Sequence, residues 1–145
     1  MKNKNIALIF NEECKIPSDY KECLISELDD INDGSCDNLY IGDTLDHINR
    51  EEIPAFLQKV VSKIKVEDGL VHIKSPDLLQ TCWYTARMNL DTNKVRYILY
   101  ETNRKNCYTL EEIVKTINNI ENTRIVNAHY VNGYEYSISV NKYEN

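Results

Sequence analysis

The sequence contains only four glycines, and the first of them is Gly34. A strand that leads into a nucleotide site normally ends in glycines, because a missing side chain lets the ligand approach the backbone. Here the apolar run at residues 6–10 continues into Asn11, Glu12 and Glu13. We therefore expect side chains to keep a cofactor away from this first turn, and the two carboxylates to repel phosphate or carboxylate groups.

The sequence also lacks the residue spacings that metal sites and disulfide frameworks use. It has five cysteines, an odd number, and no C-x-x-C pair. Its three histidines show no spacing typical of a shared metal ion. We therefore expect no metal and no disulfide framework, and we expect most cysteines to be small core residues or residues without a particular role.

Positive charge and long apolar runs are scarce as well. The 17 Lys and Arg residues stand against 23 Asp and Glu residues, which gives a net charge of −6 at pH 7. Since a binder of the nucleic-acid backbone needs a basic surface, we expect no nucleic-acid partner. No apolar run approaches the length of a membrane span or of a signal peptide's apolar region. We expect one cytoplasmic domain over residues 1–145, with no membrane partner.

A strand–helix–strand pattern is present in the middle of the chain. Its two apolar runs are residues 39–41 and 70–73, and between them apolar residues recur every three or four positions from Ile53 to Ile64. That spacing is typical of a helix with one buried side. The pattern predicts a βαβ unit, whose two strands lie parallel.

Polar residues follow both of these predicted strands. In an open parallel sheet, ligands bind beyond the carboxyl ends of the strands. We therefore expect a site here, although Asp77 fits the cap of the following helix better than a substrate contact. The residues at the two strand ends are Gly42, Asp43, Asp46 and His47, followed by Ser75 and Asp77.

The rest of the chain supplies the remaining elements. Residues 6–10 predict a strand and residues 23–26 a short one, whereas residues 95–100 fit a helix and a strand equally well. Residues 78–90 contain no breaker and predict a helix. Thr109 and Glu112 match a capping box at the start of another helix.

The C-terminal part predicts a β-hairpin. Residues 124–131 and 134–140 are rich in Val, Ile and Tyr, and Asn132-Gly133 joins them. Asn-Gly tolerates positive φ at both positions, as a two-residue hairpin turn requires.

Taken together, these motifs resemble those of class I S-adenosylmethionine-dependent methyltransferases. Residues 37–48, DNLYIGDTLDHI, resemble the family's fourth-strand motif fD-x-I-x-x-x-x-x-L-E-H. Residues 66–69 stand where the family has K-P-G-G, and residues 70–78 resemble the following strand that ends in P-D-L. Residues 108–112 resemble the helix start Y-T-x-E-E-L, and the hairpin resembles the family's last two strands.

The resemblance implies an α/β, three-layer Rossmann-like fold. It implies a shortened, mostly parallel sheet of about six strands with a C-terminal antiparallel hairpin. The family's first strand runs into a G-x-G-x-G turn, which Asn11 and its neighbours replace here. The family's second strand ends in an acidic residue that holds the ribose hydroxyls, and we find no match for it. Residues 23–28 match the third strand, so we expect the first crossover helix and the second strand to be missing or vestigial.

The resemblance also implies where S-adenosylmethionine would bind. The matched cofactor positions are Asn11, Glu27, Leu28, Asp43 and Thr44. Asp46 and His47 match the family's acidic–histidine pair. His47 could act as a proton acceptor, because its unperturbed pKa lies near neutrality, or the pair could cap and orient the turn.

Two functions remain open on this basis. The first is a methyltransferase-like domain with an eroded cofactor loop, a non-catalytic binding or regulatory module for a protein partner or a further copy of the chain. The second is an active small S-adenosylmethionine-dependent methyltransferase of unknown substrate. An enzyme that uses the same cleft for another small molecule is a third class. Tyr130, Tyr134 and Tyr136 on the hairpin are candidates for a partner surface.

Overall fold

The computed structural model describes residues 4–11, 14–87, 89–101 and 104–144. In chain order, its elements are β1 (Asn5–Ile9), β2 (Lys21–Leu24), the 3-10 helix η1 (Ile25–Asp30), β3 (Asn38–Ile41), the 3-10 helices η2 (Asp43–His47) and η3 (Arg50–Glu52), α1 (Ile53–Lys63), β4 (Leu70–Pro76), α2 (Leu78–Ala86), α3 (Thr92–Arg96), the π-helical turn η4 (Tyr97–Glu101), α4 (Leu110–Asn118), β5 (Thr123–Val131) and β6 (Glu135–Lys142).

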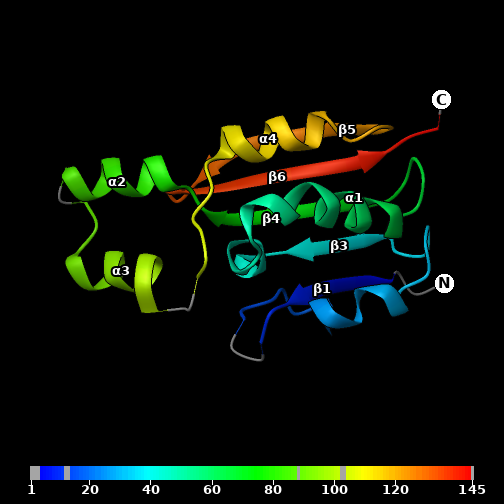
Figure 1. Ribbon diagram of the computed structural model, residues 1–145, viewed down its shortest axis with the longest axis horizontal. Helices are drawn as coiled ribbons and strands as arrows, with labels where there is room; N and C mark the ends of the chain where they lie inside the picture. The colour runs from blue at the N-terminus through cyan, green and yellow to red at the C-terminus, as the bar shows by residue number, and fades with distance from the viewer. Residues whose placement is uncertain (1–3, 12–13, 88, 102–103, 145) are drawn as a thin grey trace.

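The strands form one sheet in the order β2-β1-β3-β4-β6-β5 (Figure 1). β1 pairs in parallel with both β2 and β3, and β3 pairs in parallel with β4. β6 lies antiparallel between β4 and β5. The predicted α/β class, with a mostly parallel sheet of six strands and a C-terminal antiparallel hairpin, is confirmed.

The predicted βαβ unit is confirmed as β3, α1 and β4. α1 begins at Ile53, and Pro54 lies in its first turn, where a backbone N–H has no partner inside the helix and a proline is tolerated. The helix buries the expected side, which includes Leu57 and Val60. Asn49 precedes η3, and its side chain makes no capping hydrogen bond.

The predicted position of the first strands was partly wrong. β2 is not a third strand separated from β1, because it pairs directly with β1 and places Cys23 opposite Leu8. The second strand is therefore present, whereas the described residues between β1 and β2 contain no crossover helix. β2 is an edge strand with mostly exposed residues. Its polar Lys21 and Glu22 hide the apolar pattern by which strands are recognised.

The helical predictions near the C-terminal half are confirmed, with one ambiguity resolved. α2 ends at Ala86, so the helix predicted over residues 78–90 is shorter than expected. Residues 95–100 fall in α3 and η4 and are helical. The capping box is formed: Thr109 Oγ1 accepts the N–H of Glu112 at 3.2 Å, and the Glu112 carboxylate accepts the N–H of Thr109 at 2.9 Å.

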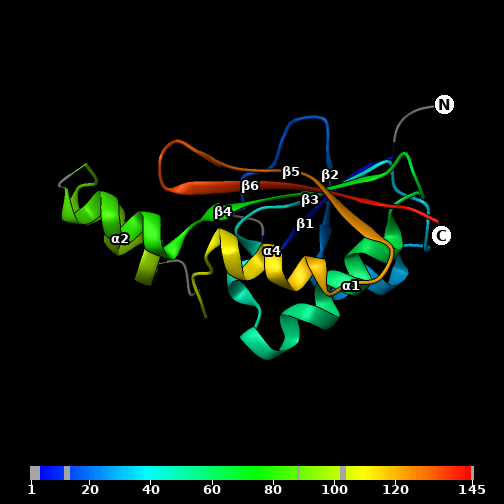
Figure 2. The ribbon, with the colours of Figure 1, turned by 90° about the horizontal axis from the view of Figure 1, so that it is seen from above.

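Helices cover one face of the sheet. In Figure 2, α1 and α4 lie below the sheet, and the segment between β1 and β2 passes above it. Over β3, β4 and β6 the upper face carries polar side chains: the ring of His72 lies 3.1 Å from Ser139 Oγ through Nδ1 and 3.3 Å from Asn38 Oδ1 through Nε2. Strands alternate their side chains between the two faces, so the apolar residues that pack on helices lie mainly on the other side. In the described residues, a loop therefore takes the place of the third layer that the resemblance implies.

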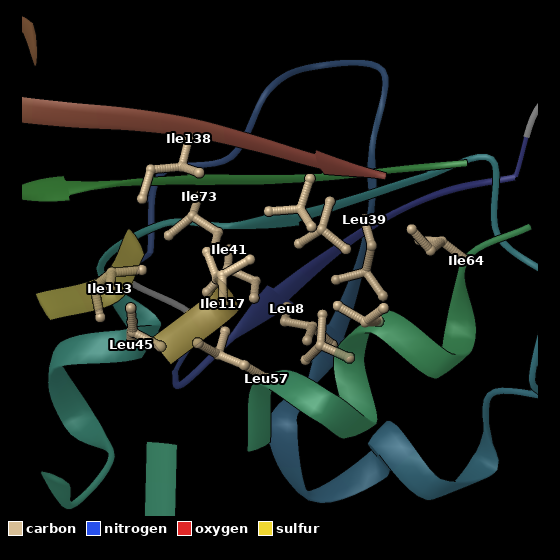
Figure 3. Close-up of a cluster of buried hydrophobic side chains, with 14 of the residues drawn as sticks. Leu8, Leu39, Ile41, Leu45, Leu57, Ile64, Ile73, Ile113, Ile117 and Ile138 are labelled. Carbon is tan, nitrogen blue, oxygen red and sulfur yellow. The ribbon is translucent and has the colours of Figure 1, made fainter. Parts of the chain in front are cut away.

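The core lies between the sheet and the helices. Figure 3 shows side chains of the strands meeting those of α1 and α4. The fully buried members of this cluster include Leu8, Leu39, Ile41, Ile73 and Ile138 from the strands, Leu45 from η2, Leu57 from α1, and Ile113 and Ile117 from α4. These residues are the apolar positions from which the elements were predicted.

The hairpin turn has the predicted geometry. Asn132 and Gly133 have φ values of 51° and 82°, so both central residues adopt positive φ. A Cβ at Gly133 would lie 2.4 Å from ring atoms of Tyr84 in α2. The glycine therefore serves both the turn and the close contact with α2.

Candidate functional site

A cleft of about 490 Å³ opens at the carboxyl ends of β1, β3 and β4. Its volume lies in the range of small-molecule sites. The chain reaches this edge through three connections: the bend after β1, η2 after β3, and the segment that leads from η4 to α4. The strand-end location is the one that the βαβ pattern predicted.

Three of the five predicted cofactor positions line the cleft. They are Asn11, Asp43 and Thr44. Thr44 Oγ1 donates a hydrogen bond of 2.8 Å to the carbonyl of Leu8. This bond joins η2 to the C-terminal end of β1 and fixes the floor of the cleft.

The other two cofactor positions do not line this cleft. The Glu27 carboxylate accepts the N–H of Leu24 at 3.2 Å, which holds the start of η1. Leu28 is 2% exposed and belongs to the core. The cause is that β2 leads directly into η1, which packs its Leu28 into the core instead of extending along the cleft.

The predicted acidic–histidine pair is divided between the interior and the cleft. Asp46 is fully buried, and its carboxylate accepts a hydrogen bond of 2.8 Å from Ser75 Oγ. His47 lines the cleft, and its ring stacks on Phe10 with a centroid distance of 4.2 Å and an interplanar angle of 6°. His47 therefore faces the cleft, whereas Asp46 does not line it.

Arg104 is a site residue that sequence reasoning missed. Its side chain is 3% exposed and forms ion pairs with Asp43, at 3.0 Å, and with the buried Asp46. Arg104 lies in a stretch without an apolar period, and its partners stand 58 and 61 positions earlier in the chain. No local pattern could have indicated this contact, because only the tertiary fold brings the three residues together.

The segment that carries Arg104 is bonded to η2 along several residues. The N–H groups of Lys105 and Asn106 both donate to the carbonyl of Asp46, at 2.9 and 3.0 Å. Tyr108 donates its hydroxyl to the carbonyl of Ile48 at 2.8 Å. The segment therefore forms a fixed wall of the cleft beside the end of β3.

The buried carboxyl of Asp46 makes the stability of the chain depend on pH. Burial raises the pKa of Asp46 to about 7, against the opposing effects of Arg104 and Ser75. The folded chain then keeps a proton that the unfolded chain loses near pH 4, so the contribution of Asp46 to stability falls as pH rises from about 4 to about 7.

We expect Asp46→Asn to remove this contribution. Urea unfolding at pH values from 4 to 8 gives the free energy of unfolding of both proteins, and the difference between them isolates Asp46 from the histidines. The free energy of unfolding of the variant is expected to rise relative to that of the parent chain as pH rises. Parallel curves for the two proteins would show that Asp46 titrates normally.

Aromatic and cysteine side chains are divided between the surface, the core and the cleft. Trp83 is 47% exposed on α2, where Arg87 lies 4.2 Å from its ring. Tyr136 is buried in the core, whereas Tyr134 lines the cleft. The five cysteines are all described and free: Cys36 is buried, Cys14, Cys23 and Cys107 are partly buried, and Cys82 is exposed.

In the part of the chain that the structure describes, no three His, Cys, Asp or Glu side chains are grouped so that they could hold a metal ion. None of the described helices is both long enough and apolar enough to span a membrane.

Sequence comparison gives no relative for this chain, because no protein-family model and no curated protein matches it. Solved structures do match its fold. A protein from Pyrococcus horikoshii OT3, PH0226, superposes with a TM-score of 0.63 and 14% identity over 95% of this chain and 71% of its own. A SAM-dependent methyltransferase from Archaeoglobus fulgidus gives a TM-score of 0.61 and 14% identity over 94% and 75%. The fold of the chain is thus that of S-adenosylmethionine-dependent methyltransferases.

Other matching structures are much longer than this chain. The magnesium protoporphyrin IX methyltransferase of Synechocystis PCC 6803, which contains bound SAH, matches with a TM-score of 0.52 and 12% identity over 83% of this chain and 49% of its own. The chain spans only 30% of an O-methyltransferase family 2 protein from Planctomyces limnophilus. These likenesses concern the fold, and the chain covers about half of the Synechocystis enzyme and less than a third of the second protein.

Proposed function

We propose that this chain is a methyltransferase-like domain that does not transfer methyl groups and acts as a binding or regulatory module. The observation that carries the proposal is that no residue of β2 or η1 lines the cleft. The resemblance implies an acidic residue at the end of the second strand, which holds the ribose of the cofactor. The residues after β2 are Ile25, Ser26 and Glu27, and the carboxylate of Glu27 is bonded to the backbone of Leu24.

The carboxylates at the end of β3 support the same conclusion. Asp43 faces the cleft, but it is paired with Arg104, which also neutralises Asp46. A polar group of a ligand would have to compete with a guanidinium that is itself buried. The residues present therefore do not fit an adenosyl cofactor.

Titration calorimetry with S-adenosylmethionine tests this proposal. We expect no heat beyond dilution at millimolar ligand, and the same result with S-adenosylhomocysteine. The control is a circular dichroism spectrum showing that the protein in the cell is folded. Binding with a micromolar dissociation constant would contradict the proposal.

An active S-adenosylmethionine-dependent methyltransferase is the second candidate. It is favoured by the position and size of the cleft, which opens at the strand ends where the fold places a ligand.

If the cofactor loop has decayed from an active ancestor, Glu12→Gly or Glu13→Gly is expected to restore binding of S-adenosylmethionine. The same calorimetry on the parent chain separates the two candidates.

A further inference from the structure

The outer edge of β5 is open. β5 is the last strand of the sheet and, among the described residues, pairs only with β6. Figure 2 looks onto this edge, and no described helix lies over it. All residues from Val126 to Tyr130 are exposed, with Val126 at 55% and Tyr130 at 46%. Such an edge presents unpaired N–H and C=O groups to another strand.

The devices that normally block an open edge are few in β5. Natural edge strands carry charged residues, prolines or bulges that prevent pairing. β5 has one charged residue, Arg124, and no proline. Its bulge lies between Ile125 and Asn127, and from Asn127 onward the pairing with β6 is regular. The second half of the edge is therefore available for pairing.

The exposed segment is self-complementary. Read in either direction, it has an apolar residue, a polar residue, a small residue, a polar residue and an apolar residue: Val126, Asn127, Ala128, His129 and Tyr130. In an antiparallel pair of two such segments centred on Ala128, Val126 lies opposite Tyr130 of the second copy. Asn127 then lies opposite His129 of the second copy.

This register also continues both faces of the sheet. Ala128 and Tyr130 stand opposite Ile138 and Tyr136 of β6, which are buried on the helix-covered face. Val126 has no partner on β6, because it is the extra residue of the bulge between Ile125 and Asn127. In the dimer, Ala128 and Tyr130 would continue the apolar side of the sheet, and Val126 would contact Tyr130 of the second copy from the bulge, as a β-branched residue beside an aromatic one.

The polar side is continued in the same way. Asn127 and His129 stand opposite Ser139 and Ser137 of β6, on the face that the helices leave open. Within one strand, Asn127 Oδ1 lies 2.6 Å from His129 Nδ1. In the antiparallel pair, the amide nitrogen of Asn127 would face the His129 ring of the second copy. The segment from Val126 to Tyr130 is thus complementary to a second copy of itself on both faces of the sheet.

We propose that two copies of this chain associate through β5, about a twofold axis at Ala128, to form one continuous sheet. An isologous contact of this kind is the common form of a homodimer. The inference is independent of whether the cleft binds S-adenosylmethionine. It gives the predicted homo-oligomer a defined surface and register.

Sedimentation velocity over a concentration series tests the association. We expect the mass to move from one copy toward two between about 1 µM and about 1 mM, because a short strand contact is weak. Ala128→Lys places two ammonium groups directly opposite each other, and we expect it to stay monomeric at every concentration. The matched control is Glu22→Lys on the other edge strand, β2, which should behave as the parent chain.

A charge-pair experiment tests the register. Ala128→Glu alone is expected to be monomeric, whereas an equal mixture of Ala128→Lys and Ala128→Glu should form a mixed dimer. A parent chain that is monomeric throughout overturns the proposal. A dimer that Ala128→Lys does not dissociate overturns the β5 interface.

Cysteine cross-linking gives a second measure of the register. Residues directly opposite in an antiparallel pair have Cα atoms about 4.5 to 5.5 Å apart, within disulfide range. Oxidised Ala128→Cys should therefore form a dimer linked through position 128, as peptide mapping would show. Tyr130→Cys is the control, because its two copies would be four residues out of line, about 14 Å apart. Equal linking at both positions would exclude this register.

Discussion

Arg104→Ala is expected to lower the free energy of unfolding at pH 8 by about 3 to 5 kcal/mol, the cost of leaving a buried charge without its partner. Arg104 is 3% exposed and Asp46 is fully buried, so the ion pair is shielded from water in the folded chain. One Asp46 oxygen has no hydrogen-bond partner among the described residues, which leaves Arg104 and Ser75 as the groups that compensate the carboxylate. Urea denaturation followed by circular dichroism measures the loss.

The matched control for this prediction is a surface pair of the same chemical type. Arg50 pairs with Glu112, but their side chains are 56% and 38% exposed. Arg50→Ala is expected to cost about 1 kcal/mol or less, since exposed ion pairs contribute little. Equal losses in the two variants would mean that the buried ion pair contributes no more to stability than the exposed one.

The pH dependence and a double variant sharpen the same test. At pH 5, below the raised pKa of Asp46, the carboxyl is mostly protonated, and the loss in Arg104→Ala should be smaller. Combining Arg104→Met with Asp46→Asn removes both charges and should recover much of the stability. A double variant that is no more stable than Arg104→Ala would contradict this account.

Asp77→Ala is expected to destabilise the chain by about 2 to 4 kcal/mol, because one carboxylate caps two helices. Asp77 Oδ1 accepts the N–H of Gln80 in α2 at 2.8 Å, and Oδ2 accepts the N–H of Leu110 in α4 at 2.7 Å. The residue is fully buried, so both N–H groups would lose their partner without gaining water. Thermal and urea unfolding give the size of the effect.

Asp91 provides the comparison for a single cap. Its Oδ1 accepts the N–H of Lys94 at 2.8 Å at the exposed start of α3. Asp91→Ala should therefore cost about 1 kcal/mol. Asp77→Asn, which keeps one acceptor oxygen, should fall between the two alanine variants. If Asp77→Ala costs no more than Asp91→Ala, the second cap contributes nothing.

Asp77 also shows how far local pattern extends. Its position before a helix predicted the cap of α2, and the structure confirms it. The bond to Leu110 was not predictable, because it joins residues 33 positions apart. It depends on α2 and α4 beginning at the same end of the sheet.

The sequence by itself determined the elements that show a regular apolar period or a local capping or turn motif. The βαβ unit, the capping box at Thr109 and the Asn132–Gly133 turn are all set by neighbouring residues, and all three are present. The parallel pairing of β3 and β4 follows as well, because a strand that returns after a crossover helix lies parallel.

Only the tertiary structure decided where β2 lies, which face of the sheet remains without helices, and what the strand-end carboxylates contact. The sequence predicted a short strand at residues 23–26, which overlaps β2 (Lys21–Leu24), but only the fold shows that this strand is the exposed edge beside β1. Asp46 looked like a partner of His47, but Arg104 reaches it from a distant segment and holds it in the interior. Contacts between segments far apart in the chain leave no local period, so only the tertiary structure shows which groups line the cleft and which are held in the interior.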